Sequence, residues 1–203
     1  MESPALSRRS LLQAIGVVIA TAATPLGWED VAQAMDDADA HAGQLAGPGK
    51  LSFLTSAEAA DIEAVAAQII PTDDTPGARE AGVIEFIDRA LATFYSQLGS
   101  DYRAQLTAFQ AACRESHPGA LSFAALTSDQ QIEFLTRVDD TPFFNTTRLL
   151  TLLGMFALPS YGGNRDGSGW KLLGFEDTHV FHPPFGYYDR DYPGFAADAS
   201  KTR

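Results

Sequence analysis

The histidines are the first residues of this chain to test for metal chemistry, and there are four of them. His179 and His182 form the one pair at ligand-like spacing, three positions apart. Two ligands on one helix face stand four positions apart, whereas this pair lies in a proline- and aromatic-rich segment. A di-iron bundle needs Glu-x-x-His on two helices. No histidine follows at that spacing after the glutamates of the predicted helices, Glu58, Glu63, Glu80, Glu85, Glu115 and Glu133. We predict no metal site in this chain.

Nucleophilic and acid–base chemistry also lacks a constellation of suitable side chains. The single cysteine, Cys113, falls on the apolar stripe of a predicted helix, where a buried and inert thiol is the usual state. Asp73 and Asp74 lie in a predicted turn, where carboxylates usually cap the backbone or face solvent. One cysteine allows neither an intramolecular disulfide nor a CxxCH haem attachment. We therefore predict no catalytic residue and no cofactor bound by this chain.

The glycine-rich stretch from Gly162 to Gly169 superficially resembles a phosphate-binding loop. Such a loop ends in Gly-Lys-Ser/Thr after a parallel strand, but here Gly167 is followed by Ser168 and then glycine, and no strand is predicted. A dinucleotide site would need a strand–turn–helix unit that is also missing from the predicted pattern. These glycines therefore indicate tight turns of the backbone.

The length and charge of the chain restrict its partners. Its 203 residues suffice for one domain and an export segment, and the formal net charge is −12. An acidic protein repels phosphate backbones, so nucleic acid is not an expected partner.

Residues 1–34 are typical of a twin-arginine export signal. Arg8 and Arg9 precede leucines and a mildly apolar run, residues 11–23, and a small-x-small cleavage pattern occupies residues 32–34. The apolar run is shorter than the roughly 20 residues of a membrane span. Because the twin-arginine translocase carries folded proteins, we expect a periplasmic protein. A chain with no cofactor site of its own that uses this route suggests export of a bound companion. Residues 35–50 are acidic and glycine-rich, which predicts a flexible linker.

About five helices are predicted over residues 51–158. Thr55 and Thr127 each open a capping box, and Thr141 precedes a proline suited to a first helical turn. Ser100 is a candidate cap for the third helix. Residues 143–158 are apolar on nearly every face, which is typical of the buried centre of a bundle. The faces expected to be buried carry Ile62, Val65, Ile69, Ile84, Ile87, Leu91, Phe94, Leu98, Tyr102, Leu106, Phe109, Ile132, Leu135 and Val138.

From residue 159 to 203 the sequence is rich in glycine, proline and aromatic residues and has no period. We predict an all-α domain, a small bundle with an irregular C-terminal tail over residues 159–203. Aromatic residues and arginine are frequent anchors of protein interfaces, so the tail is a candidate partner surface. The alternative is that its aromatics close the open end of the bundle. The candidate interface residues are Tyr161, Gly162, Gly163, Asn164, Arg165 and Trp170.

Three segments together resemble the gluconate 2-dehydrogenase subunit 3 family. The first runs from Ile69 to Val83 and leads into Phe-Ile-Asp at residues 86–88. The second is Phe-x-x-Leu at 123–126. The third is Pro-x-Tyr-Gly-Gly-Asn-Arg-Asp at 159–166, followed by Gly-Trp-Lys at 169–171 and by Gly174. Leu158 departs from the family pattern, which often has an aspartate there.

The resemblance implies a non-catalytic small subunit of a periplasmic, membrane-associated dehydrogenase complex. The implied partners are a flavin-containing subunit of the glucose–methanol–choline oxidoreductase type, which carries FAD, and a cytochrome c subunit, which carries haem. The small subunit would bind, stabilise and escort the flavin subunit through the twin-arginine translocase. The implied substrate is a sugar, sugar acid or polyol. Alternatives are a stand-alone periplasmic enzyme and a small-molecule-binding module, either with a pocket near Tyr161–Trp170.

Overall fold

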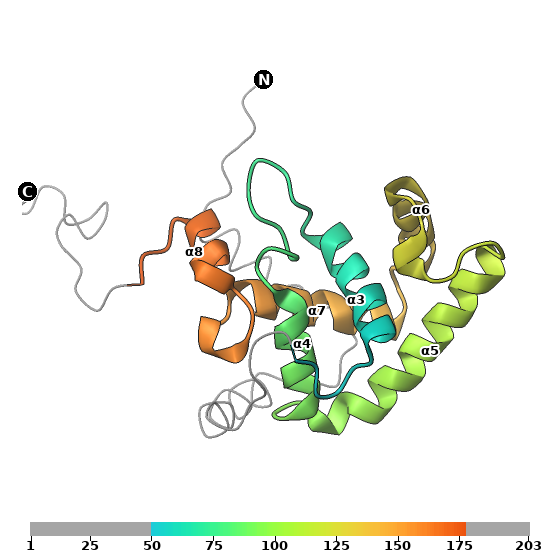
Figure 1. The fold of residues 1–203 in the computed structure, drawn as a ribbon, viewed down its shortest axis with the longest axis horizontal. Helices are drawn as coiled ribbons and strands as arrows, with labels where there is room; N and C mark the ends of the chain where they lie inside the picture. The colour runs from blue at the N-terminus through green and yellow to red at the C-terminus, as the bar shows by residue number, and fades with distance from the viewer. Residues whose placement is uncertain (1–49, 178–203) are drawn as a thin grey trace, which may run out of the picture.

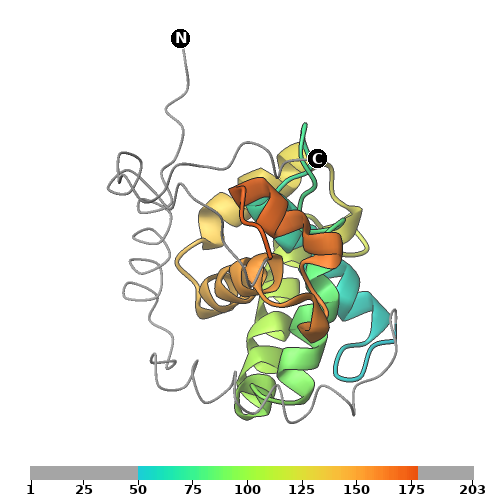
Figure 2. The ribbon, with the colours of Figure 1, turned by 90° about the vertical axis from the view of Figure 1, so that its left-hand side faces the viewer.

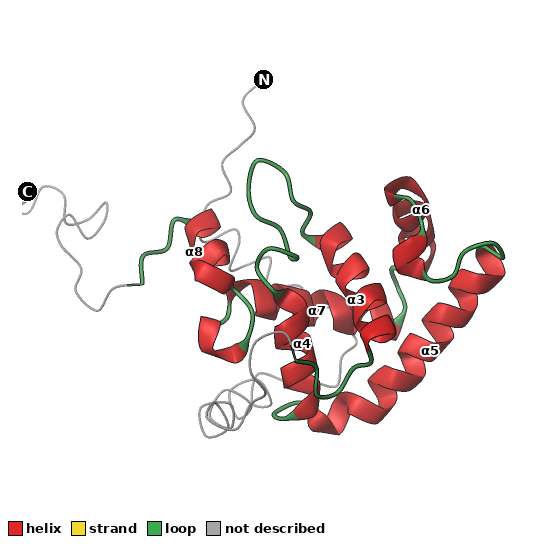
Figure 3. Cartoon of the chain, viewed as in Figure 1, coloured by secondary structure: helices red, strands yellow, loops and turns green. Residues whose placement is uncertain are grey.

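The structure, a computed structural model, describes residues 50–177. This part of the chain is built from helices and turns and contains no strand (Figure 3). The α-helices are α3 (Ser56–Ile69), α4 (Val83–Ala92), α5 (Gly99–Ser116), α6 (Ser128–Val138), α7 (Pro142–Phe156) and α8 (Ser168–Leu173). Short 3-10 helices are η1 (Ser96–Leu98), η2 (Phe123–Ala125), η3 (Pro159–Tyr161) and η4 (Arg165–Gly167). The all-α fold predicted from the sequence is confirmed.

Three helices begin at the caps that the sequence predicts. The Thr55 hydroxyl accepts from the backbone N–H of Glu58, whose carboxylate accepts in return from the Thr55 backbone. Thr127 and Gln130 form the same reciprocal box at the start of α6. The Thr141 hydroxyl caps α7 by accepting from the backbone N–H of Phe144, the third residue of the helix. Each cap satisfies donors that the first turn leaves without an intrahelical partner.

The connection between α4 and α5 differs from the prediction. The apolar stripe predicts one helix reaching Leu98, but α4 ends at Ala92 and Thr93 leaves the helical conformation at φ −128° and ψ −99°. The chain re-enters through η1, and α5 begins at Gly99 without a side-chain cap, so Ser100 does not serve as one. Leu98 already has right-handed helical angles. The 3-10 turn leads directly into α5 and takes the place of a separate cap.

Helix α7 lies at the centre of the domain, as its apolar sequence predicts. It packs against α3, α4 and α5 (Figure 1). Leu150 and Met155 are fully buried. Buried threonines complete the packing: the Thr147 hydroxyl lies 2.9 Å from the Tyr102 hydroxyl, and Thr151 donates to the Thr147 carbonyl. The hydroxyls of Tyr102, Thr147 and Thr151 therefore each have a partner.

A buried carboxylate holds the segment that enters α3. Asp88 on α4 accepts the backbone N–H groups of Ser52, Phe53 and Leu54 at 2.7, 2.9 and 2.8 Å. Arg103 on α5 donates to the Phe53 carbonyl over 2.7 Å and lies 4.5 Å from the centre of its ring. Hydrogen bonds to a charged group are among the stronger ones, so α4 and α5 together fix this non-helical entry.

The stretch after Pro159 is more regular than the sequence predicts. Residues 159–174 form η3, η4 and α8 in succession, hereafter the C-terminal module. Glycines and two left-handed residues, Asn164 and Asp166, turn the chain between these short helices, which is why no period is visible. The module lies against the end of α7, at the opposite end of the long axis from α6 (Figure 1), and α8 faces the viewer in Figure 2.

Candidate functional site

Backbone-to-backbone contact attaches the C-terminal module to the end of α7. A Cβ atom on Gly163 would overlap the carbonyl oxygen of Gly154, and one on Gly169 would overlap that of Met155. No side chain fits at either position, because moving a helix backbone is far costlier than turning a flexible side chain. Gly163 and Gly169 therefore allow close packing on α7, a role that the sequence interpretation of these glycines as turn residues did not include.

The module also caps the carbonyl end of α7. Asn164 is fully buried; its Nδ2 donates to the Ala157 carbonyl and its Oδ1 accepts from the Gly169 backbone, both at 2.8 Å. The indole Nε1 of Trp170 donates to the Phe156 carbonyl at 2.9 Å. The last carbonyls of a helix have no intrahelical donor, and these two side chains supply one. Asparagine also suits the left-handed conformation at residue 164, where φ is 47°.

Tyr161 and Gly162 close the module against α4. The Tyr161 side chain is buried, and its ring lies 6.3 Å from that of Phe94. Gly162 has φ 109°, and its backbone lies against Glu85 and the Arg89 side chain. Arg89 in turn donates to the Ser160 carbonyl at 3.1 Å. Of the residues predicted as an interface, Tyr161, Gly163 and Asn164 are thus inside the fold and Gly162 and Trp170 are partly covered.

Arg165 joins the two most distinctive sequence segments. Its backbone N–H donates to the Ala81 carbonyl at 3.0 Å, and its guanidinium lies 2.7 Å from the Glu85 carboxylate. The guanidinium passes over Gly82, where a Cβ atom would lie 2.9 Å from Nη2. Half of the Arg165 side chain remains exposed, which makes it the most accessible of the predicted interface residues. Segments some 80 residues apart therefore form one surface.

The 71–77 loop, between α3 and α4, is held by two carboxylates, Asp73 within it and Glu80 just after it. Glu80 accepts from the Thr72 hydroxyl at 2.6 Å and from the Gly77 backbone, and the Thr72 bond is the main cause that lowers its pKa. Asp73 accepts from the backbone and hydroxyl of Thr75, which lower the pKa of Asp73. Asp73 is a turn residue, as the sequence predicts.

A groove of about 310 Å³ separates the 71–77 loop from α8. Two of its charged groups already have partners among the described residues, since Glu80 is held by Thr72 and Arg165 by Glu85. The Ser168 hydroxyl is buried without a hydrogen-bond partner. The remaining lining residues are Thr75, Pro76, Asp166, Lys171 and Leu172. The described lining residues include no histidine or cysteine.

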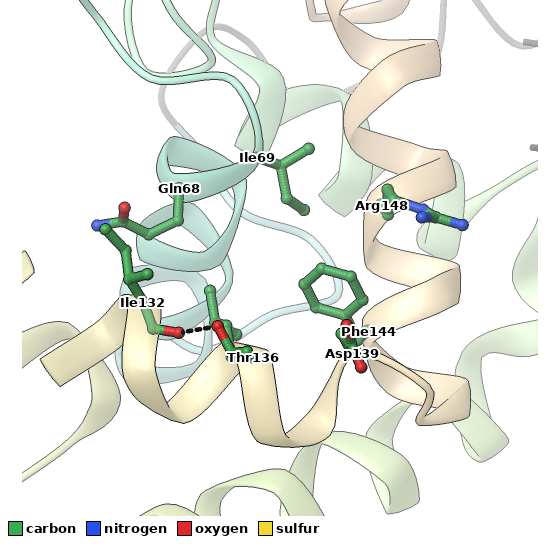
Figure 4. A pocket seen from close by; sticks show the side chains of 8 residues that line it. Gln68, Ile69, Ile132, Thr136, Asp139, Phe144 and Arg148 are labelled. Atoms are coloured by element: carbon green, nitrogen blue, oxygen red, sulfur yellow. Dashed lines mark hydrogen bonds between the residues drawn. The ribbon is translucent and has the colours of Figure 1, made fainter. Parts of the chain in front are cut away.

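A second groove of about 370 Å³ lies where α3, α6 and α7 meet (Figure 4). Ile69, Leu135 and Phe144 provide much of its apolar lining. Gln68 is occupied by Gln131, to which it donates at 2.8 Å. In Figure 4 the Arg148 guanidinium points away from the other labelled side chains. The polar groups therefore do not converge on a common point, as they do in a ligand site.

Other sequence candidates lie in the core or outside the described residues. Cys113 is buried in the core, and burial is the main cause that raises its pKa. His117 follows α5, its ring 6.2 Å from that of Phe134. Arg8, Arg9, His179 and His182 lie outside the described residues. Glu176 stands three positions before His179, one Glu-x-x-His spacing that the sequence reasoning overlooked. Within residues 50–177, no cluster of three or more potential metal ligands occurs.

The family model for gluconate 2-dehydrogenase subunit 3 matches residues 56–177. The chain belongs to the gluconate 2-dehydrogenase subunit 3 family. Neither the curated proteins nor the solved structures give a match. The matched range begins at the first residue of α3 and ends just past the C-terminal module. The helical domain and its module are therefore the part of the chain that this family of small dehydrogenase subunits shares.

Exposed apolar side chains mark a part of this subunit 3 domain that the sequence reasoning missed. Leu158, Leu172 and Phe175 are 45%, 44% and 49% exposed, and all three lie on or beside the C-terminal module. Leu121 and Ile132 are the other large apolar residues exposed in the described domain. The expectation that Ile132 is buried was therefore wrong: α6 turns Gln131, Phe134 and Leu135 inward, and Ile132 lines the open groove beside α3. A helix as short as α8 shows no period that would reveal which of its faces is buried. Across the described residues, no helix is both long and apolar enough to cross a bilayer.

Proposed function

We propose that this chain is the non-catalytic small subunit of a periplasmic dehydrogenase complex, where it binds, stabilises and escorts the flavin-containing subunit. The observation that carries the proposal is the joining of the two most distinctive segments by Arg165, Ala81 and Glu85 into one surface module within the matched family range. Within this module, Asn164 and Trp170 cap the end of α7 and Tyr161 packs in the core. Leu158, Leu172 and Phe175 beside them are exposed, which favours a role in protein contact.

The proposed complex follows from the family and from the N-terminal sequence. The flavin subunit would carry FAD and oxidise a sugar, sugar acid or polyol, and a cytochrome c subunit would take the electrons. Arg8 and Arg9 would direct the folded chain, together with its bound partner, to the twin-arginine translocase. The complex would then be periplasmic, and membrane-associated through its other subunits.

The alternative is a small-molecule-binding module or a stand-alone enzyme. The groove beside Arg165 and Lys171 favours it, because about 310 Å³ is at the lower end of the size of ligand pockets. The apolar residues Leu158 and Phe175 favour a protein partner, since they are not among the residues that line this groove. Turnover of a sugar or polyol by the isolated chain would support the alternative.

The proposal can be tested by measuring whether the flavin-containing subunit depends on this chain for export to the periplasm. The double variant Arg8→Lys, Arg9→Lys should retain this chain in the cytoplasm, because ammonium groups do not reproduce the planar donor array of paired guanidinium groups. The co-expressed flavin subunit should remain there with it, as measured by fractionation and flavin fluorescence. The matched control is Arg79→Lys, Arg137→Lys, two half-exposed arginines in surface ion pairs. A flavin subunit that still reaches the periplasm with the Arg8, Arg9 variant would contradict the escort role.

A further inference from the structure

The groove between α8 and the 71–77 loop has two apolar walls. Leu172 on α8 is 44% exposed, and Pro76 stands in the loop across from it. One wall belongs to the C-terminal module, which the Arg165–Glu85 ion pair ties to α4. The other wall is the 71–77 loop, which the Thr72–Glu80 hydrogen bond holds. A preformed cleft between held walls requires little ordering when a side chain enters it.

The charges at the groove restrict what can bind. Arg165 is paired with Glu85, whereas Glu80 keeps its negative charge and accepts a hydrogen bond from the Thr72 hydroxyl. Lys171 has no ion pair among the described residues, and Asp166 at the same groove has none either. Asp166 would repel a uniformly acidic partner surface, and Lys171 would repel a uniformly basic one. An apolar projection inside a rim of mixed charge fits both, which is the usual anatomy of a protein interface.

The exposed apolar surface extends beyond the groove. Phe175 is 49% exposed, and its ring lies 5.5 Å from that of Trp170. Trp170 directly precedes Lys171 and Leu172, which line the groove. A small ligand in the groove would leave these rings in water, whereas a protein partner can cover them. After Asp177 a further 26 residues follow, with six aromatic residues among them. The chain therefore continues from this surface with more residue types that favour interfaces.

We propose that this surface, Pro76, Lys171, Leu172 and Phe175, is where the flavin-containing subunit docks, and that an apolar side chain of that subunit enters the groove. The proposal rests on the proposed function and relocates the contact. The interface predicted from sequence centred on Tyr161–Trp170, but Tyr161, Gly163 and Asn164 are buried. Partner contact falls instead on the outer side of the segment that these residues hold in place.

The flavin subunit is first purified as a complex with the wild-type chain and then separated from it. The test measures how tightly it binds the purified full-length chain, as wild type and as each variant. Leu172→Asp places a charge in an apolar contact and should weaken binding by about tenfold or more. Lys171→Glu should cause a smaller loss, about fivefold, that shrinks at high salt. Leu121→Asp is the matched control: Leu121 is 93% exposed and lies between α5 and η2, away from the module. Its binding should equal that of the wild type.

The outcomes separate this inference from the proposed function. If the wild-type chain binds no flavin subunit, both fail. If wild-type and Leu172→Asp chains bind equally, the function stands and this surface is not the interface. Leu172→Asp should leave the melting temperature of the isolated chain unchanged, since the side chain is exposed. A clear drop would mean that residues of the chain itself cover the groove, which would overturn the proposal.

Discussion

The indole nitrogen of Trp170 donates a 2.9 Å hydrogen bond to the carbonyl oxygen of Phe156, so a residue of α8 caps the end of α7. The last carbonyls of a helix otherwise rely on water or on a local turn. Here the donor comes from a later helix, and the bond forms only when the C-terminal module is docked. The end of α7 and the placement of the module are therefore coupled.

Trp170→Phe tests this cap with little change in shape. The variant keeps an aromatic ring but leaves the Phe156 carbonyl without its donor, so we expect a loss of about 1 kcal/mol in the free energy of unfolding. Urea denaturation of the isolated chain measures it. Tyr161→Ala, at a buried ring, should cost about 3–5 kcal/mol. A Trp170→Phe variant as stable as the wild type would show that water replaces the indole at this carbonyl.

Asn164→Ala should destabilise the chain by about 3 kcal/mol. It removes a donor from the Ala157 carbonyl and an acceptor from the Gly169 backbone, and it places alanine at a left-handed backbone position. Thermal and urea unfolding measure the loss. The control is Asp166→Ala, also left-handed but exposed and without the paired bonds, which should cost about 1 kcal/mol. Equal losses would assign the whole effect to backbone strain.

Asp88→Ala should release the segment that enters α3. Three backbone donors at 52–54 would lose a buried carboxylate, so we expect about 3 kcal/mol of lost stability. Proteolysis near Phe53 should become faster than in the wild type. Asp74→Ala, at an exposed loop position, is the control and should change neither readout. Unchanged proteolysis of Asp88→Ala would mean that Arg103 alone holds the segment.

Alkaline pH should destabilise the domain through two buried groups. Burial raises the pKa of Tyr102, offset in part by its bond to Thr147, and burial followed by the Asp61 charge raises the pKa of Cys113. In the unfolded chain these groups lose protons near pH 10 and about 8.5. The folded chain keeps both protons to higher pH, so stability is full below the unfolded pKa values and falls as pH rises above them.

Urea midpoints between pH 7 and pH 11 measure this fall. Tyr102→Phe removes one titrating hydroxyl and should flatten the curve above about pH 10, although it is less stable at pH 7 because Thr147 loses a partner. Cys113→Ala should flatten the curve from about pH 8.5. A curve for Tyr102→Phe parallel to that of the wild type would assign the alkaline transition to other groups.

Local features of the fold could be predicted because their causes lie within a few residues. The caps at Thr55, Thr127 and Thr141 depend on side chains three positions from their partners. The buried position of α7 follows from apolar residues on nearly all of its faces. The break after Ala92 was missed, because the apolar spacing continues through Leu98 while Thr93 leaves the helix.

The sequence by itself determined the helical class, the starts of α3, α6 and α7 and the central place of α7, because capping bonds within a few residues and the distribution of apolar residues produce these signals. The family resemblance came from three motif segments. Only the tertiary structure decided which tail residues face inward. Gly163 and Gly169 touch the backbone of α7, and Asn164 and Trp170 satisfy its last carbonyls. Arg165 meets Glu85 across 80 positions. Contacts between segments so far apart in the sequence depend on how α4 and α7 pack against each other, and a pattern of neighbouring residues cannot predict that packing.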